Sequence, residues 1–270
     1  SIFTYMEEHL KKNQSVYIIL IISLAAIFSF LCFDNKISIA NDDALYIEAA
    51  SSYAKNFFGY YYTETAPLYP MVISFIIKIF GVKLFILKTS SILFFCVALL
   101  LIYKSFKDQI PYLILIPVLL LTATNAQFLV FASLTYTETF SLMMFGVAFL
   151  YFFKMIDKFE SPDYTLKSNL IYFFSLGIVC LILMITRNVA LAALGIVLLF
   201  LVYRKKYMET LLTAVSFAVF YFIYRTALKY IWHLSDSQFS SQGSKMFNKD
   251  AYQPQLGKET VWGLVVRFWE

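Results

Sequence analysis

The sequence predicts an all-α protein, a polytopic bundle of about seven transmembrane helices with amphipathic helices along its outer face. Hydrophobic residues make up 60% of the 270-residue chain and charged residues only 14%, with a mean hydropathy of +0.71, whereas about a quarter of a soluble domain is charged. The apolar residues also fall into runs of roughly 17–23 residues, the length of helix that crosses a bilayer. Because lipid offers backbone polar groups no hydrogen-bonding partner, each run must be helical.

Seven apolar runs account for the predicted spans: residues 16–33, 84–103, 111–130, 140–153, 170–185, 189–203 and 211–231. The fourth and the sixth are short, and their helices could extend at either end. The first is too long for a secretory signal peptide, and no small-residue cleavage pattern follows it. These runs are nearly free of charge, with Arg225 and Lys229 as the chief exceptions.

Basic residues mark alternate loops. The basic loops contain Lys11 and Lys12, Lys104 and Lys107, Lys154, Lys158 and Lys167, and Arg204, Lys205 and Lys206. The loop 125–139 has no Lys or Arg, and the turn near residue 186 has only Arg187. The positive-inside rule therefore predicts an integral plasma-membrane protein, such as one of a bacterial inner membrane, with a cytoplasmic N-terminus. Residues 34–83 and 232–270 then lie outside.

The net charge of +5 reflects this bias between the loops, so it indicates membrane topology and not a nucleic-acid partner. We expect residues 1–231 to form the transmembrane domain and residues 232–270 an outer juxtamembrane segment. The ending GKETVWGLVVRFWE carries no terminating signal, which suggests the N-terminal part of a larger membrane protein. No His/Cys cluster has metal-ligand spacing, and P-loop, dinucleotide and hydrolase-elbow motifs are absent from the sequence. ATP-driven transport and soluble hydrolase chemistry therefore lose support.

An acidic pair opens the first outer segment. Asn41 is a good N-cap, and Asp42 and Asp43 fall in the first helical turn, where negative charge suits the helix dipole. Apolar and polar residues then occupy opposite faces at helical spacing: Tyr46, Ala50, Tyr53 and Phe57 against Glu48, Ser51, Ser52 and Lys55. This pattern predicts a short amphipathic helix lying on the outer surface. Residues 67–80 predict a second, half-buried helix that ends at Gly81.

Two further charged residues lie at the outer ends of predicted spans. Glu138 begins the fourth span, and either it belongs to a site with Asp42 or it completes a capping box with Thr135. Arg187 lies at the outer turn between spans five and six, where it either clamps a phosphate or anchors the turn by snorkelling. Basic side chains of the last outer segment are phosphate-binding candidates of the same kind, or solvated loop charges: Lys245, Lys249, Lys258 and Arg267.

These features follow one another along the chain in an order that is similar to that of a known family. One span precedes an outer loop whose acidic pair opens an amphipathic helix, and a helix beginning PLYP follows. An outer TET, a TR turn and the outer stretch KDAYQPQLGKET come after it. This order resembles the GT-C superfamily of polytopic glycosyltransferases, and within it the branch of protein O-mannosyltransferases and lipid A aminoarabinose transferases. The likeness covers essentially the whole chain and rests on the order of short motifs.

The resemblance implies particular site residues. The family's first outer loop has an Asp-Glu pair and, after two residues, a Tyr, matched here by Asp42-Asp43-Ala44-Leu45-Tyr46 with Asp as the second acid. The family's Lys-Pro-Pro-Leu is Thr65-Ala66-Pro67-Leu68 here, so the motif's lysine is missing. Asp42 falls on the catalytic acid, Glu138 on the acid that heads the fourth span, and Arg187 on the basic turn residue. The resulting candidates are catalytic Asp42, Asp43 and Glu138, and substrate-binding Tyr46, Arg187 and Lys249.

The implied reaction is sugar transfer at the outer face. The donor would be a polyprenyl-phosphate sugar in the membrane lipid, and the acceptor a hydroxyl of a glycan, lipid or protein. An ionised aspartate can accept the hydroxyl proton as the bond forms, and a cation can stabilise the leaving phosphate. A divalent metal is compatible with this chemistry but not required by it, and the sequence indicates no certain cofactor. Two other classes stay open: a secondary transporter or flippase of lipid-linked substrates, and an inactive assembly or lipid-binding subunit.

Overall fold

The computed structural model describes residues 2–34, 36, 42–160, 165–234, 248, 257–258, 260 and 262–263. The predicted all-α class is confirmed, because this part of the chain forms eleven α-helices and one short 3₁₀ helix. The elements are α1 (Ile2–Lys12), α2 (Gln14–Leu31), α3 (Asp42–Lys55), α4 (Leu68–Phe80), α5 (Leu84–Phe106), α6 (Tyr112–Ala123), α7 (Ala126–Ala132), α8 (Thr137–Glu160), α9 (Leu166–Thr186), η1 (Asn188–Ala190), α10 (Leu191–Tyr203) and α11 (Tyr207–Ile231).

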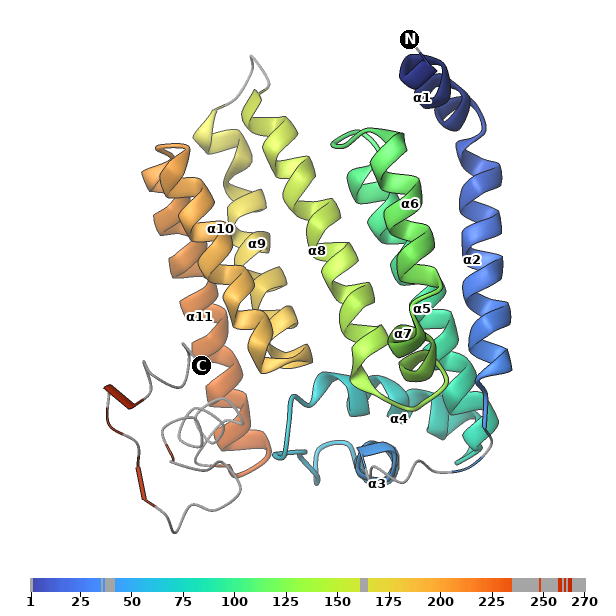
Figure 1. Cartoon of the computed structure of the whole chain (residues 1–270). Coiled ribbons are helices and arrows are strands. Elements are labelled where there is room, and N and C mark those ends of the chain that lie inside the picture. Colours follow the sequence, from blue (N-terminus) through green and yellow to red (C-terminus); the bar gives the residue numbers. More distant parts are fainter. Residues whose placement is uncertain are drawn as a thin grey trace.

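The long helices run side by side, and α3 and α4 lie across one end of the bundle (Figure 1). Within the described residues, five helices are long and apolar enough to cross a membrane: α2, α5, α8, α9 and α11. The bent pair α6 and α7 makes a sixth if it counts as one span. The chain is therefore an integral membrane protein with five to six candidate spans, fewer than the seven predicted.

Two of the predicted spans differ from a simple crossing helix. The run 111–130 is broken, with α6 and α7 bent by 56°, and the Asn125 side chain accepts the backbone N–H groups of Gln127 and Phe128 at 3.0 and 3.2 Å to start α7. The run 189–203 forms η1 and α10, a short apolar segment. At 1.5 Å per residue this segment covers about 24 Å, less than the roughly 30 Å of a hydrocarbon core. It nevertheless links the end where α9 stops to the end where α11 starts (Figure 1).

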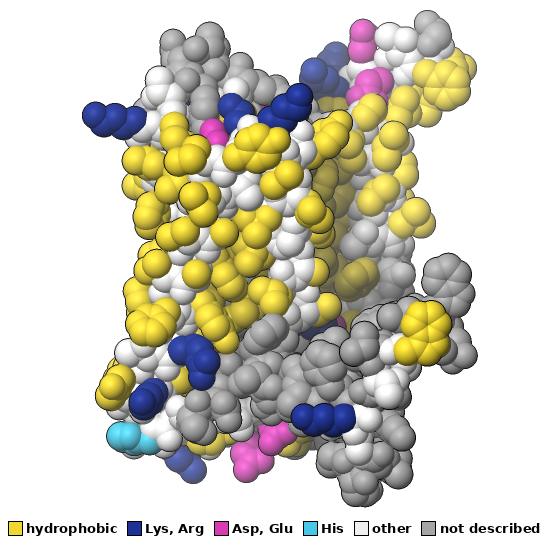
Figure 2. Space-filling model, turned by 90° about the vertical axis from the view of Figure 1, so that its left-hand side faces the viewer, with side chains coloured by type: hydrophobic (Ala, Val, Ile, Leu, Met, Phe, Trp, Pro, Cys, Tyr) yellow, Lys and Arg dark blue, Asp and Glu magenta, His cyan; other side chains and the backbone are white. Residues whose placement is uncertain are grey.

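The two ends of the bundle carry the loops as the sequence predicts. The N-terminal helix, the α5–α6 turn, the facing ends of α8 and α9 and the α10–α11 turn share one end, and α3, α4 and the α9–η1 turn share the other (Figure 1). On the face formed by α10 and α11, described hydrophobic side chains cover the middle, and Lys and Arg gather toward the two ends (Figure 2). This banded surface suits a helix bundle in lipid.

Residues 34–83 contain the two helices that the sequence predicts, α3 and α4. In α3, Tyr46, Ala50 and Tyr53 are buried, whereas Glu48 and Lys55 are exposed. The helix α4 ends at Gly81, whose backbone has a φ of 75° and donates its N–H to the Ile77 carbonyl at 2.8 Å. A positive φ costs glycine little, so the helix stops here as the sequence indicated. The helices α3 and α4 pack on each other and against the first turn of α8, which brings these two helices to the start of the fourth predicted span.

Candidate functional site

A polar cavity of about 290 Å³ opens at the end of the bundle that carries α3 and α4. Its lining comes from α3, the loop before α4, the first turn of α8 and the α9–η1 turn, so it joins segments that are far apart in the sequence. The lining residues are Asp42, Tyr46, Thr65, Ala66, Thr137, Glu138, Thr186, Arg187, Asn188 and Val189. The structure thus brings together Asp42, Tyr46, Glu138 and Arg187, four of the six predicted site residues.

Asp42 begins α3 and presents an exposed side chain to the cavity. Its position in the first turn places the carboxylate near the positive end of the helix dipole. Asn41, the predicted N-cap, lies outside the described residues. An ionised, accessible carboxylate can accept either a proton or a hydrogen bond from a molecule in the cavity.

Glu138 and Arg187 form an ion pair across the cavity wall. The Arg187 Nη1 atom donates to the Glu138 Oε1 atom at 3.1 Å, and the two side chains are 41% and 23% exposed. The capping-box alternative for Glu138 is wrong, because α8 begins only at Thr137 and the Thr135 hydroxyl has no hydrogen-bond partner in the described part of the chain. The ion pair with Glu138 instead orients Arg187 and holds its guanidinium at the cavity. This contact argues against simple snorkelling of Arg187.

Tyr46 supplies a neutral hydrogen-bond donor. Its hydroxyl lies 3.5 Å from the Thr65 hydroxyl. Burial raises the pKa of Tyr46 above its usual value, and the nearby carboxylates of Glu138 and Asp42 add to this effect, while hydrogen bonds to Thr65 and Thr137 oppose it. The phenol therefore stays protonated at neutral pH and can donate to an oxygen in the cavity.

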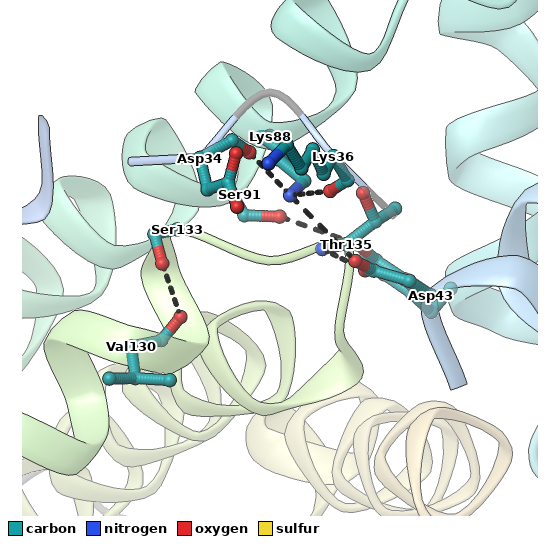
Figure 3. Close-up of polar contacts among 9 residues, drawn as sticks. Asp34, Lys36, Asp43, Lys88, Ser91, Val130, Ser133 and Thr135 are labelled. Carbon is teal, nitrogen blue, oxygen red and sulfur yellow. Dashed lines mark hydrogen bonds and ion pairs between the residues drawn. The ribbon is translucent and has the colours of Figure 1, made fainter. Parts of the chain in front are cut away.

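Asp43, although adjacent to Asp42, points away from the cavity and is fully buried. One of its carboxylate oxygens, Oδ1, accepts the backbone N–H of Thr135, and the other, Oδ2, lies 3.9 Å from the Lys88 Nζ atom. Lys88 is also fully buried and donates to the backbone carbonyls of Asp34, at 2.6 Å, and Lys36. Figure 3 shows the lysine ammonium directed at these oxygens from α5.

The sequence interpretation missed Lys88. The sequence did hold a signal for this contact. A lysine inside the apolar run 84–103 is energetically costly unless its charge is paired. Lys249, the sixth predicted site residue, lies outside the described residues, as do Lys245 and Arg267. These three therefore stay predictions.

Among the described residues, the polar cavity offers few side-chain ligands for a divalent metal. Of the two carboxylates that line the cavity, Glu138 is already paired with Arg187. No group of three or more His, Cys, Asp or Glu side chains with suitable placement occurs among the described residues.

An apolar cavity of about 250 Å³ shares Val189 with the polar cavity. It lies between α8, α9 and α10. Its lining residues are Phe145, Ala148, Phe149, Phe152, Leu176, Val179, Cys180, Leu183, Val189, Ala190, Ala192, Ala193, Ile196 and Val197. A polar cavity at the end of the bundle therefore adjoins an apolar one between its helices.

No protein-family model, curated protein or solved structure matches the chain. The fold and the cavities define the class of the protein: a polytopic helical membrane protein with five to six candidate spans and a charged cavity at one end. The resemblance to GT-C glycosyltransferases therefore rests on the sequence motifs alone.

Proposed function

We propose that this protein is a membrane glycosyltransferase that moves a sugar from a polyprenyl-phosphate donor to an acceptor hydroxyl at the outer face of the membrane. One observation carries the proposal: an accessible carboxylate, Asp42, and a guanidinium, Arg187, line the same small cavity at the end of a membrane-embedded bundle. Transfer from a phosphate-linked donor requires a base for the acceptor and a cation for the leaving group, and these two groups can supply them.

The reaction is a direct displacement at the anomeric carbon. The acceptor oxygen attacks that carbon while its proton passes to the Asp42 carboxylate. The bond between the anomeric carbon and the phosphate oxygen breaks, and polyprenyl phosphate leaves with the electron pair. The sugar is transferred with inversion, and the proton on Asp42 is later released to water.

Arg187 is suited to the leaving phosphate. A guanidinium presents five N–H donors in a fixed fork that matches phosphate oxygens. Within the described structure, Arg187 makes a single side-chain hydrogen bond, to Glu138, and its side chain is 41% exposed. The remaining N–H groups are therefore accessible to an anion, and Tyr46 can donate to a further oxygen of the sugar or phosphate.

The apolar cavity supports a lipid-linked donor. A polyprenyl chain must remain in an apolar environment while its phosphate reaches Arg187. The cavity between α8, α9 and α10 has such a lining and meets the polar cavity at Val189. A water-soluble sugar nucleotide has no hydrocarbon chain that could occupy the apolar cavity.

The outer placement rests on charge. The end opposite the cavity carries the basic loops of α5–α6 and α10–α11 (Figure 1), and such loops face the cytoplasm by the positive-inside rule. We therefore propose a cytoplasmic N-terminus, with the cavity at the outer surface of a plasma membrane such as a bacterial inner membrane.

Binding of polyprenyl phosphate, the product common to every donor sugar, tests the proposal. We expect the protein in nanodiscs to bind radiolabelled polyprenyl phosphate and to leave the uncharged polyprenol unbound. Replacement Arg187→Gln should weaken binding by about tenfold or more, because a charge-assisted hydrogen bond contributes about 1.5–3 kcal/mol.

Lys229→Gln is the matched control, since Lys229 is an exposed cation at the same end of the bundle, in the last turn of α11, and does not line the cavity. Equal binding by the wild type and Arg187→Gln, or no binding at all, would contradict the proposed donor. A transporter of lipid-linked substrates would also bind the lipid, but it would form no glycosylated product from a labelled donor.

A further inference from the structure

We propose that Lys88 and Asp43 are positioning residues that hold Asp42 opposite the Glu138–Arg187 pair. This inference rests on the proposed function for its consequence in catalysis, and on geometry alone for its consequence in structure. Neither residue lines the polar cavity, so neither is assigned contact with substrate.

Lys88 joins three segments at one buried point. It extends from α5, and its ammonium donates to the backbone carbonyls of Asp34 and Lys36 in the segment after α2. The same ammonium lies 3.9 Å from the Asp43 carboxylate at the start of α3. Both charged side chains are at most 1% exposed, where an unpaired charge would be very costly. The ammonium and its three oxygen neighbours therefore restrict where the first outer segment can lie (Figure 3).

Asp43 extends this restraint to α8. Its Oδ1 atom accepts the backbone N–H of Thr135, two residues before α8 begins. Glu138 follows three residues later, in the first turn of α8. A short path of covalent and hydrogen bonds thus runs from Asp42 through Asp43 and Thr135 to Glu138.

The neighbouring acids therefore have different tasks. Successive residues of a helix point about 100° apart, which lets Asp42 face the cavity while Asp43 faces the bundle. Displacement of a reacting group by about 1 Å can lower a rate by about 100-fold. A buried connection between the helix that carries Asp42 and the helix that carries Glu138 would prevent such a displacement.

Spin-label distances test the positioning directly. Labels on Glu48→Cys in α3 and Gln127→Cys in α7, in a background without native cysteines, lie on exposed positions at the same end of the bundle. We expect one narrow distance distribution in the otherwise unaltered protein. Lys88→Met should broaden it, because the ammonium no longer holds the first outer segment. Lys78→Met, which removes an exposed lysine from α4, should leave it unchanged.

A double variant guards against simple unfolding. Lys88→Met leaves the Asp43 carboxylate buried without its cation, whereas Lys88→Met with Asp43→Asn removes both charges, and paired removal is often tolerated. We expect the double variant to fold and still to give a broad distribution, because the bonds to the Asp34 and Lys36 carbonyls are gone. A distribution as narrow as that of the wild type in the folded double variant would overturn the inference.

Kinetics supply the second measurement. The double variant should lower kcat at least tenfold and change the affinity for polyprenyl phosphate less than twofold, because Arg187 lies on the α9–η1 turn. An equal loss of affinity and rate would indicate general disruption and contradict a positioning role. If the wild type transfers no sugar while the distances behave as expected, the proposed function fails and the structural part of the inference stands.

Discussion

The adjacent carboxylates Asp42 and Asp43 should respond oppositely to the same isosteric change. Asp43→Asn removes the anion that lies 3.9 Å from the buried Lys88 ammonium. At this distance and an effective dielectric constant near 20, the lost Coulomb attraction is about 4 kcal/mol. Measured losses on breaking buried ion pairs, about 3–5 kcal/mol, agree with this figure. The asparagine oxygen can still accept the Thr135 N–H, so the loss should come mainly from the ion pair.

Asp42→Asn is the matched control for this prediction. Asp42 is exposed and pairs with no cation in the described part of the chain. It lies at a helix start, where asparagine is also favourable. We expect its apparent melting temperature, measured in detergent by intrinsic fluorescence or by retention of the folded peak on size exclusion, to stay close to that of the wild type. Asp43→Asn should melt clearly lower. Equal melting temperatures for the two variants, or a lower value for Asp42→Asn, would refute the assignment of Asp43 to a buried ion pair.

Two further predictions concern packing and topology. A Cβ at Gly177 would lie 2.6 Å from the Phe217 backbone nitrogen and force α9 and α11 apart. Gly177→Ala should therefore lower the free energy of unfolding by about 1–3 kcal/mol. Gly195→Ala, where the Cβ would meet open space, is the control in the same melting assay, and an equal effect of both changes would contradict the close approach of α9 and α11. Cysteines at Glu48 and Lys205 occupy opposite ends of the bundle, so an impermeant thiol reagent on intact cells should label Glu48→Cys and not Lys205→Cys. The reverse labelling would move the cavity to the cytoplasmic side.

The parts of the fold that depend on local sequence were predictable. Burial of one face of α3 follows from the spacing of Tyr46, Ala50 and Tyr53, and the end of α4 follows from Gly81. The approach of Asp42, Glu138 and Arg187 was also predictable, because alternating spans return the chain to the same membrane surface. These arguments need only helical periodicity, apolar run length and loop charge.

The remaining features depend on tertiary packing. The sequence alone does not indicate that Lys88 contacts Asp43 and not solvent, since the contact joins α5 to α3, which are brought together only by the folded chain. The same limit explains why the sequence left the capping box open as an alternative. Thr135 and Glu138 have the right spacing, but the Asp43 carboxylate accepts the Thr135 N–H and Arg187 donates to the Glu138 carboxylate. Asn125 is a favourable N-cap residue, so the sequence held a local signal for the start of α7. The apolar run continues on both sides of Asn125, however, and this run predicted a single unbroken span.

We propose that Asp42 acts as the base in sugar transfer from a polyprenyl-phosphate donor. The most direct measurement is the rate at which the purified, reconstituted protein transfers a labelled hexose from a polyprenyl-phosphate hexose to an acceptor hydroxyl, compared between the wild type and Asp42→Asn. Loss of a positioned base should reduce the rate by about 10²–10⁴-fold, with polyprenyl phosphate binding and melting temperature unchanged. Transfer at the wild-type rate by the folded Asp42→Asn variant would contradict the account.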